Sequence, residues 1–174
     1  MELYPPKKGK VGRYNCSSLW GIVYGYLSPE QFINGEEIDF KSALRMYNGT
    51  HDHEKTQKLL KGYECEIKKE YEIDGITLVG KVDAINKEEI LEIKTSDKVF
   101  ENAKRWHIYQ GKIYCTLFNM PVCYIVQPVY TDTELYLKVV GEAKRNDSWF
   151  AKQIKILKEF HQQVYERANN KIIR

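Results

Sequence analysis

The chain has 174 residues, of which 43% are apolar and 29% are charged, and its net charge is +3. This composition is that of one folded domain, here taken as residues 1–174, and it excludes disordered, collagen-like and low-complexity proteins. No run approaches the roughly 18 consecutive apolar residues of a membrane helix, and the first residues lack the apolar core of a signal peptide. We therefore expect a domain without membrane contact, located in the cytoplasm, or in the host-cell cytoplasm if the protein is viral.

The two ends of the chain differ from its middle. Residues 1–14 are rich in Pro, Gly and Lys and predict a basic N-terminal arm. Residues 148–168 have apolar side chains at helical spacing and predict a long helix in the C-terminal segment 148–170. Both ends carry an excess of Lys and Arg that could contact phosphates, although a solvated surface is the simpler interpretation of each run alone.

Two helices are predicted in the first third of the chain. Residues 16–27 favour a short helix, which Gly21 and Gly25 weaken. Its aromatic side chains are expected in the core, and they are Trp20, Tyr24 and Tyr26. A longer helix is predicted from an N-cap at Asp39 to about Lys61, with Gly62 just after its end.

Gly49 lies inside the predicted helix from Asp39 to Lys61. Glycine in a helix interior costs about 1 kcal/mol relative to alanine. Close packing or a functional contact at this position would explain its presence.

The hydrophobic period changes to that of strands after residue 62. Residues 63–73 and 76–85 alternate, and the Asp74-Gly75 pair between them is a strong hairpin signal. A turn at 86–89 leads to a third strand at 90–95. The remaining elements are a helix over roughly 99–119, strands at 122–130 and 134–140, and the C-terminal helix. This order predicts an α/β (α+β) domain, with a central mixed sheet of about five strands flanked by helices.

Three charged residues fall on one face of the predicted second and third strands. Glu92 and Lys94 share a face because side chains alternate along a strand. If the turn 86–89 places Ile85 opposite Ile90, then Asp83 lies directly opposite Glu92. Two carboxylates and one ammonium group would then converge on one patch.

Facing carboxylates repel each other, and a divalent cation between them would remove the repulsion. Oxygen ligands completed by water and phosphate suit Mg²⁺ or Mn²⁺, which can activate water for phosphodiester hydrolysis. A solvated salt bridge explains the patch alone about equally well. However, both strands are mostly apolar around these residues, and charge in such strands is costly unless it has a use.

One motif consists of Asp83, eight further residues and then Glu92-Ile93-Lys94. It resembles the motif of the PD-(D/E)XK nuclease superfamily, and more specifically that of its RecB-nuclease branch, which includes CRISPR-associated RecB-like exonucleases. Gly49 with His53 is similar to the G-x-x-x-H motif of that branch, and Gln110 with Tyr114 matches its Q-x-x-x-Y motif. The resemblance covers residues 40–118.

The resemblance also extends to a glutamate on the first strand, at Glu64 or Glu66, and it has one clear departure. Many relatives hold an iron–sulfur cluster with one N-terminal cysteine and three near the C-terminus. Here no cysteine follows Cys123, so we do not expect an Fe–S cluster. The four cysteines lack C-x-x-C spacing and are expected to be reduced, and three of them, Cys65, Cys115 and Cys123, are expected in the core.

The resemblance implies a restriction-endonuclease-like core and a Mg²⁺- or Mn²⁺-dependent deoxyribonuclease. His53, Asp83 and Glu92 would bind metal, with the Ile93 carbonyl as a further ligand. Lys94 would orient the attacking water, Gln110 would hold Lys94 or a phosphate, and Tyr114 would support the helix or the substrate. His51, two residues from His53, is expected to point elsewhere. Three cations are expected to flank the cleft, namely Arg45, Lys104 and Arg105.

The implied substrate is DNA, as single strands or frayed duplex ends, in recombination, repair or mobile-element and viral DNA processing. The alternatives are a non-catalytic nucleic-acid-binding or scaffold protein on the same fold, and a structure- or sequence-specific endonuclease. The sequence leaves open whether the protein is an exonuclease or an endonuclease, the polarity of cleavage, the preference for DNA or RNA, and whether it forms a homo-oligomer. The roles of Glu54, Glu64 and Glu66 also stay open.

Overall fold

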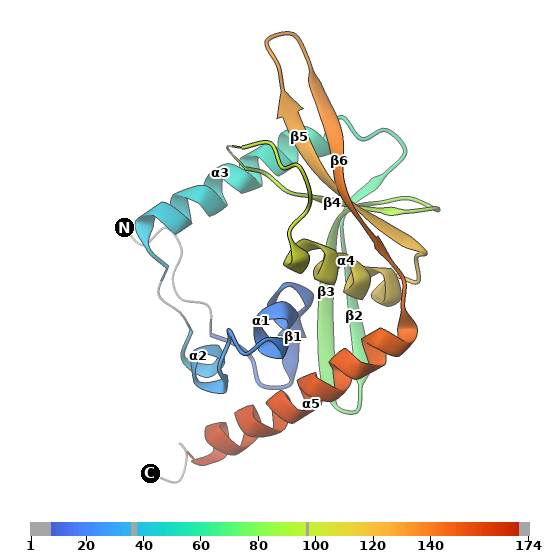
Figure 1. The fold of residues 1–174 in the computed structure, drawn as a ribbon. Helices are drawn as coiled ribbons and strands as arrows, with labels where there is room; N and C mark the ends of the chain where they lie inside the picture. Colours follow the sequence, from blue (N-terminus) through green and yellow to red (C-terminus); the bar gives the residue numbers. More distant parts are fainter. Residues whose placement is uncertain (1–7, 36–37, 97, 171–174) are drawn as a thin grey trace.

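One mixed sheet with helices packed against it forms the domain in a computed structural model that describes residues 8–35, 38–96 and 98–170 (Figure 1). The elements are β1 (Arg13–Asn15), η1 (Cys16–Ser18), α1 (Leu19–Val23), α2 (Pro29–Asn34), α3 (Phe40–Gln57), β2 (Glu64–Ile73), β3 (Ile76–Ile85), β4 (Ile90–Ile93), α4 (Arg105–Leu117), β5 (Val122–Tyr130), β6 (Leu135–Lys144) and α5 (Asp147–Asn170). The predicted fold class is confirmed, and among the described residues the sheet has six strands.

β3 lies at the centre of the sheet and has three neighbours. β2 pairs with it antiparallel over its whole length, through the predicted hairpin turn. Asp74 and Gly75 both have positive φ angles, 49° and 79°, as a two-residue turn of this kind requires. β1 pairs with β3 in parallel, and β4 pairs with it antiparallel. β4 continues to β5, and β5 to β6.

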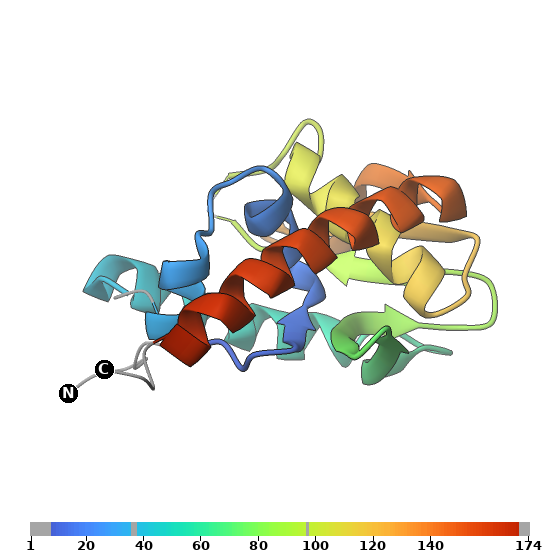
Figure 2. The same ribbon diagram turned by 90° about the horizontal axis from the view of Figure 1, so that it is seen from below.

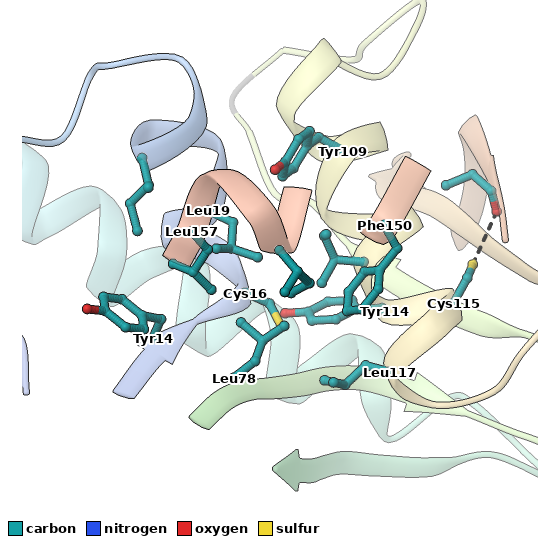
Figure 3. Packing of buried hydrophobic residues seen from close by; sticks show 14 of the residues in the cluster. Tyr14, Cys16, Leu19, Leu78, Tyr109, Tyr114, Cys115, Leu117, Phe150 and Leu157 are labelled. Atoms are coloured by element: carbon teal, nitrogen blue, oxygen red, sulfur yellow. Dashed lines mark hydrogen bonds between the residues drawn. The ribbon is translucent and has the colours of Figure 1, made fainter. Parts of the chain in front are cut away.

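Most of the core lies between one face of the sheet and the helices α1, α2, α4 and α5. Seen from below, α5 runs across this layer beside α1 and α4 (Figure 2). Figure 3 shows how side chains from all of these elements meet, with Tyr14 and Leu78 from the sheet and Tyr114 and Leu157 from the helices.

A smaller cluster covers the opposite face near β4. It contains Ala84, Leu91, Ile93 and Val126, with side chains from the segment after α3 packed on it. All four residues of β4 are therefore buried, although they alternate between two faces. A charged residue on this strand is consequently placed in a buried environment.

The expected N-terminal arm is only partly correct. Residues 1–7 lie outside the described part of the chain. Arg13 to Asn15, however, form β1, and Tyr14 is fully buried with its hydroxyl 2.9 Å from His161 Nδ1. The pairing partner, residues 77–79, is more than 60 positions away, and the local composition therefore does not reveal this strand.

The predicted helix over 16–27 is shorter than expected. It consists of η1 and α1 and ends at Val23, and Gly25 has a φ of +73°. The expectation of a core position is wrong for Tyr24 and Tyr26, which are exposed, whereas Trp20 is half-buried against the core.

Two predicted helix boundaries are also wrong. α3 ends at Gln57, and Gly62, with a φ of +82°, lies in the turn beyond it. α4 begins only at Arg105, because Gln127 holds the preceding segment in an extended loop. The Gln127 amide accepts from Phe100 N at 2.7 Å and donates to Lys98 O at 2.8 Å.

The four cysteines are free. Cys115 and Cys123 are buried as expected, and Cys16 is buried too, whereas Cys65 is only half-buried. Within the described ranges, no helix combines the length and the apolar character needed to cross a membrane.

Candidate active site

The candidate site lies where the sheet is open along one edge of β3. Because β2 occupies the other edge, β1 and β4 share this one, at residues 77–79 and 84–85 respectively. Residues 80–83 lie between them. A cavity of about 400 Å³ opens at this place, and its walls are Asn15, Cys16, Ser17, Lys68, Val79, Lys81, Asp83, Glu92, Gln110 and Tyr114.

Asp83 and Glu92 meet in this cavity. Ile85 pairs with Ile90 and Ala84 with Leu91, which is the predicted register. Both carboxylates are nearly inaccessible, with exposed fractions of 7% and 3%. Asp83 Oδ2 accepts a hydrogen bond of 2.7 Å from the backbone N–H of Ile93. The turn geometry therefore brings two acidic side chains together inside the protein.

Glu92 is only partly balanced by its neighbours. Its Oε1 is 2.6 Å from Lys94 Nζ, but its buried Oε2 has no hydrogen-bond partner among the described residues. Burial, and then the Asp83 charge, raise the pKa of Glu92 to about 7, against the opposing effect of Lys94. A buried carboxylate oxygen without a partner is costly, and it is available to a ligand.

A chain of polar contacts runs from Lys94 into α4. Lys94 Nζ donates to Gln110 Oε1 at 3.2 Å, and Gln110 Nε2 donates to the Tyr114 hydroxyl at 2.7 Å. The two α4 residues are one helical turn apart, as the sequence motif predicts. Tyr114 is buried, with its hydroxyl pointing toward Cys16 (Figure 3). It therefore supports Gln110 from within the core.

His53 reaches the site from α3. Its Nδ1 is 3.5 Å from Asp83 Oδ1, and its side chain is 24% exposed. Burial alone would lower the pKa of His53, but the Asp83 carboxylate outweighs it, so that the pKa is raised. His51 is 63% exposed and lies 3.8 Å from Glu54. The two histidines point in different directions, as expected.

Gly49 faces Thr95, which lies two residues beyond the end of β4. A Cβ at Gly49 would lie 3.1 Å from Thr95 Oγ1. The close approach of α3 to Thr95 is the packing reason for a glycine inside this helix.

The cavity wall differs from the predicted set of site residues. Arg45, Lys104 and Arg105 are exposed and do not line the cavity; Lys104 lies over the rings of Phe100 and Trp106. Six lining residues were not predicted from the sequence: Asn15, Cys16, Ser17, Lys68, Val79 and Lys81. Lys81 could have been found, because it lies two residues before Asp83 on the same strand.

The side chains at the site provide part of a metal-binding set. Among the described residues, no three His, Cys, Asp or Glu side chains form a complete ligand cluster, and Lys94 contacts one oxygen of Glu92. The unpartnered Glu92 Oε2, the facing Asp83 carboxylate and the nearby His53 nevertheless fit a hard cation that keeps open positions for water and substrate. The residues therefore suit Mg²⁺ or Mn²⁺, which keep several water ligands, better than an ion that needs protein ligands on all sides.

No protein-family model matches the sequence, and no curated protein matches it significantly. Solved structures resemble it. The alkaline exonuclease LHK-Exo of Laribacter hongkongensis is 16% identical over 94% of both chains, with a TM-score of 0.63. LHK-Exo in complex with dAMP aligns equally well, over 94% of this chain and 96% of that chain. A phage-related exonuclease from Haemophilus somnus 129PT is 15% identical over 97% of both chains, with a TM-score of 0.56. At these identities the likeness establishes a shared fold.

Proposed function

We propose that this chain is a divalent-metal-dependent nuclease that hydrolyses phosphodiester bonds in DNA. One observation carries the proposal: Glu92 presents a buried carboxylate oxygen that no described residue hydrogen-bonds, in the same cavity as Asp83 at an open edge of the sheet. The fold shared with solved exonucleases supports the same conclusion. Membership of the RecB-like branch of the PD-(D/E)XK superfamily, without an Fe–S cluster, is part of the proposal.

The metal would be held by Asp83, Glu92 and His53, with the main-chain carbonyl of Ile93 as a further ligand. Bound Mg²⁺ or Mn²⁺ supplies Lewis acidity toward the phosphate and lowers the pKa of its water. Asp83 would offer Oδ1, the oxygen that faces His53 Nδ1, because Oδ2 already accepts from Ile93 N–H. Glu92 stays ionised in the pH range above about 7, where its second oxygen is available.

Lys94 is proposed to orient the attacking water and to offset the negative charge that develops on the phosphate. Its position supports this role, because Glu92 and Gln110 fix the ammonium group from two sides. Gln110 in turn is fixed by the buried Tyr114 hydroxyl. The hydrogen bonds from the buried Tyr114 through Gln110 thereby hold the Lys94 ammonium group in a fixed position.

The proposed substrate is the end of a DNA strand, single-stranded or frayed, with products that carry a 5′-phosphate. The cavity of about 400 Å³ lies in the size range of small-ligand sites, and Lys68 and Lys81 give its wall positive charge. The complex of LHK-Exo with dAMP shows that a protein of this fold binds a mononucleotide. An exonuclease is therefore the form of the activity that we propose.

The test is a cleavage assay on labelled DNA, single- and double-stranded, linear and circular, with Mg²⁺, Mn²⁺ or EDTA. We expect linear DNA to be degraded with either metal, and neither circular DNA nor any EDTA sample to be cleaved. Asp83→Asn should abolish cleavage, because an amide oxygen still accepts from Ile93 N–H but carries no charge. Asp132→Asn, in the exposed turn between β5 and β6, should retain it.

Two results would contradict this proposal. Cleavage of circular DNA would make the protein an endonuclease. Binding of DNA without cleavage under any metal condition would instead favour a nucleic-acid-binding scaffold.

A further inference from the structure

α3 brings His53 to the site, but packing secures this helix only weakly. Among its described side chains only Ala43 and Thr56 are buried, and Thr56 bonds to Asp52 O within the same helix. Large apolar residues such as Leu44 and Tyr47 are exposed. Figure 1 shows α3 apart from α1, α2 and α5, and its contacts are chiefly with β3. Polar contacts must therefore fix its position.

Gln57 provides such contacts at the end of α3. It lies one helical turn after His53, and thus on the same side of the helix. Its Nε2 donates to the backbone oxygen of Asp83 at 3.0 Å and to Glu66 Oε1 at 2.7 Å. One side-chain amide therefore links the helix that carries His53 to both strands beside it.

The Asp83 carbonyl needs this partner because the ladder is interrupted there. Cys65 pairs with Ala84 and Ile67 with Val82, but the register passes over Glu66 and Asp83. Glu66 has a φ of +59°, a conformation that is uncommon for residues other than glycine, asparagine and aspartate. An unpaired carbonyl at a buried residue is unfavourable. The amide of Gln57 takes the place of a strand neighbour.

Glu66 is itself held by a second group. Its Oε2 pairs with Lys81 Nζ, which lines the cavity two residues before Asp83. Both acceptors of Gln57 are thereby fixed to the part of β3 that carries the site. A shift of Gln57 would move His53 relative to Asp83.

We propose that Gln57 is a positioning residue for the metal site. Its amide holds the end of α3 on Asp83, and thereby sets His53 Nδ1 opposite Asp83 Oδ1 so that both can bind one metal ion. This inference rests on the proposed function, since it concerns the same metal ion. In this proposal Gln57 acts through His53 and Asp83 and is not itself a metal ligand.

The test compares Gln57→Met with Lys55→Met in the full chain. Methionine keeps the length of Gln57 but cannot donate a hydrogen bond, and Lys55 is an exposed residue of the same helical turn. Mn²⁺ binding without DNA is measured by the electron paramagnetic resonance signal of the free ion. Loss of groups that orient metal ligands typically weakens metal binding about 10- to 100-fold, and we expect this for Gln57→Met. Lys55→Met should stay within about twofold of wild type.

Hydrogen–deuterium exchange of residues 50–57 in the metal-free protein is the second measurement. We expect faster exchange in Gln57→Met and unchanged exchange in β4 and α4. Gln57→Asn, which is too short to reach both acceptors, should behave like Gln57→Met. Wild-type Mn²⁺ affinity in the Gln57 variants would overturn the inference, even with faster exchange. If the wild type itself binds no Mn²⁺, the proposed function fails. The link made by Gln57 is then judged on exchange alone, and unchanged exchange would overturn it.

Discussion

Asp83 on β3 and Glu92 on β4 lie one position beyond the last paired residues of the two strands, and Asp83 Oδ2 accepts a 2.7 Å hydrogen bond from the residue after Glu92, Ile93. The side chain of Asp83 thus continues the contact between the strands beyond the last backbone pair, Ala84 with Leu91. This arrangement fixes one carboxylate oxygen and keeps two negative groups close together in a buried place. Such an arrangement is costly for the fold, and binding of a cation would offset the cost.

Glu92→Gln should separate stability from activity. At pH 8 the wild-type carboxylate is ionised although burial and Asp83 raise its pKa to about 7. A neutral amide removes this cost, so we expect the free energy of unfolding at pH 8, measured with urea and EDTA, to be unchanged or higher. DNA cleavage should fall by at least about 100-fold, the scale seen when a group that stabilises developing charge is lost. A large loss of stability would show that Glu92 serves mainly the fold.

Lys94→Met should reduce cleavage without weakening metal binding. The ammonium group contacts Glu92 Oε1, and its removal leaves that oxygen free for a cation. We expect kcat to fall about 100-fold or more, KM for DNA to change little and Mn²⁺ affinity to be retained. Lys87→Met, in the exposed turn 86–89, is the matched control. Loss of Mn²⁺ affinity in Lys94→Met would mean that this residue organises the carboxylates instead of the water.

The parts of the site that follow from local rules could be predicted from the sequence. The Asp74-Gly75 turn fixed the hairpin, and the four residues 86–89 fixed the register that places Asp83 opposite Glu92. His53 and Gln110 followed from motifs on single helices, and the structure places both next to the strand residues that they were expected to join. Strand alternation and turn length sufficed for Asp83 and Glu92, because each rule acts over a few positions, whereas His53 and Gln110 came from the resemblance to the RecB-nuclease branch.

Other features depend on contacts between distant segments and left no local signal. β1 is three residues long, and its partner lies more than 60 positions away. The start of α4 is delayed because Gln127, on β5, binds the segment before it. The link from Gln57 to Asp83 was invisible for the same reason, since it depends on an interruption of the β2–β3 ladder at Glu66.

His107 should make the protein less stable in mild acid. It is buried, its Nδ1 has no hydrogen-bond partner in the described part of the chain, and burial, followed by Lys94 and Lys104, lowers its pKa to about 4. The unfolded chain takes up this proton near pH 6.5. The stability that neutral, buried His107 contributes is therefore fully present above that pH and is lost as the pH falls toward 4. At about 1.4 kcal/mol for each pH unit between these values, the loss reaches about 3 kcal/mol.

His107→Phe tests this dependence, because a similar ring without a titrating group should remove it. Unfolding by urea is measured with EDTA at pH 8, 6.5 and 5 for both proteins. The variant should become progressively more stable than the wild type as the pH falls. His53 and Glu92, whose pKa values are raised, act in the opposite direction in both proteins, so the difference between the proteins isolates His107. A difference independent of pH would contradict the assignment.

Thr95 should limit the gain in stability that Gly49→Ala can give. Alanine in a helix interior is worth about 1 kcal/mol over glycine, but the added Cβ would lie 3.1 Å from Thr95 Oγ1. We expect Gly49→Ala alone to gain clearly less than this and to lower activity, because α3 must move away from the end of β4. In a Thr95→Ala background the hydroxyl is absent, so the full gain of about 1 kcal/mol should appear and part of the activity should return. Urea unfolding of the four proteins gives the coupling between the two positions directly. Additive effects would mean that the helix and the strand end do not restrain each other, and Gly49 would then need another explanation.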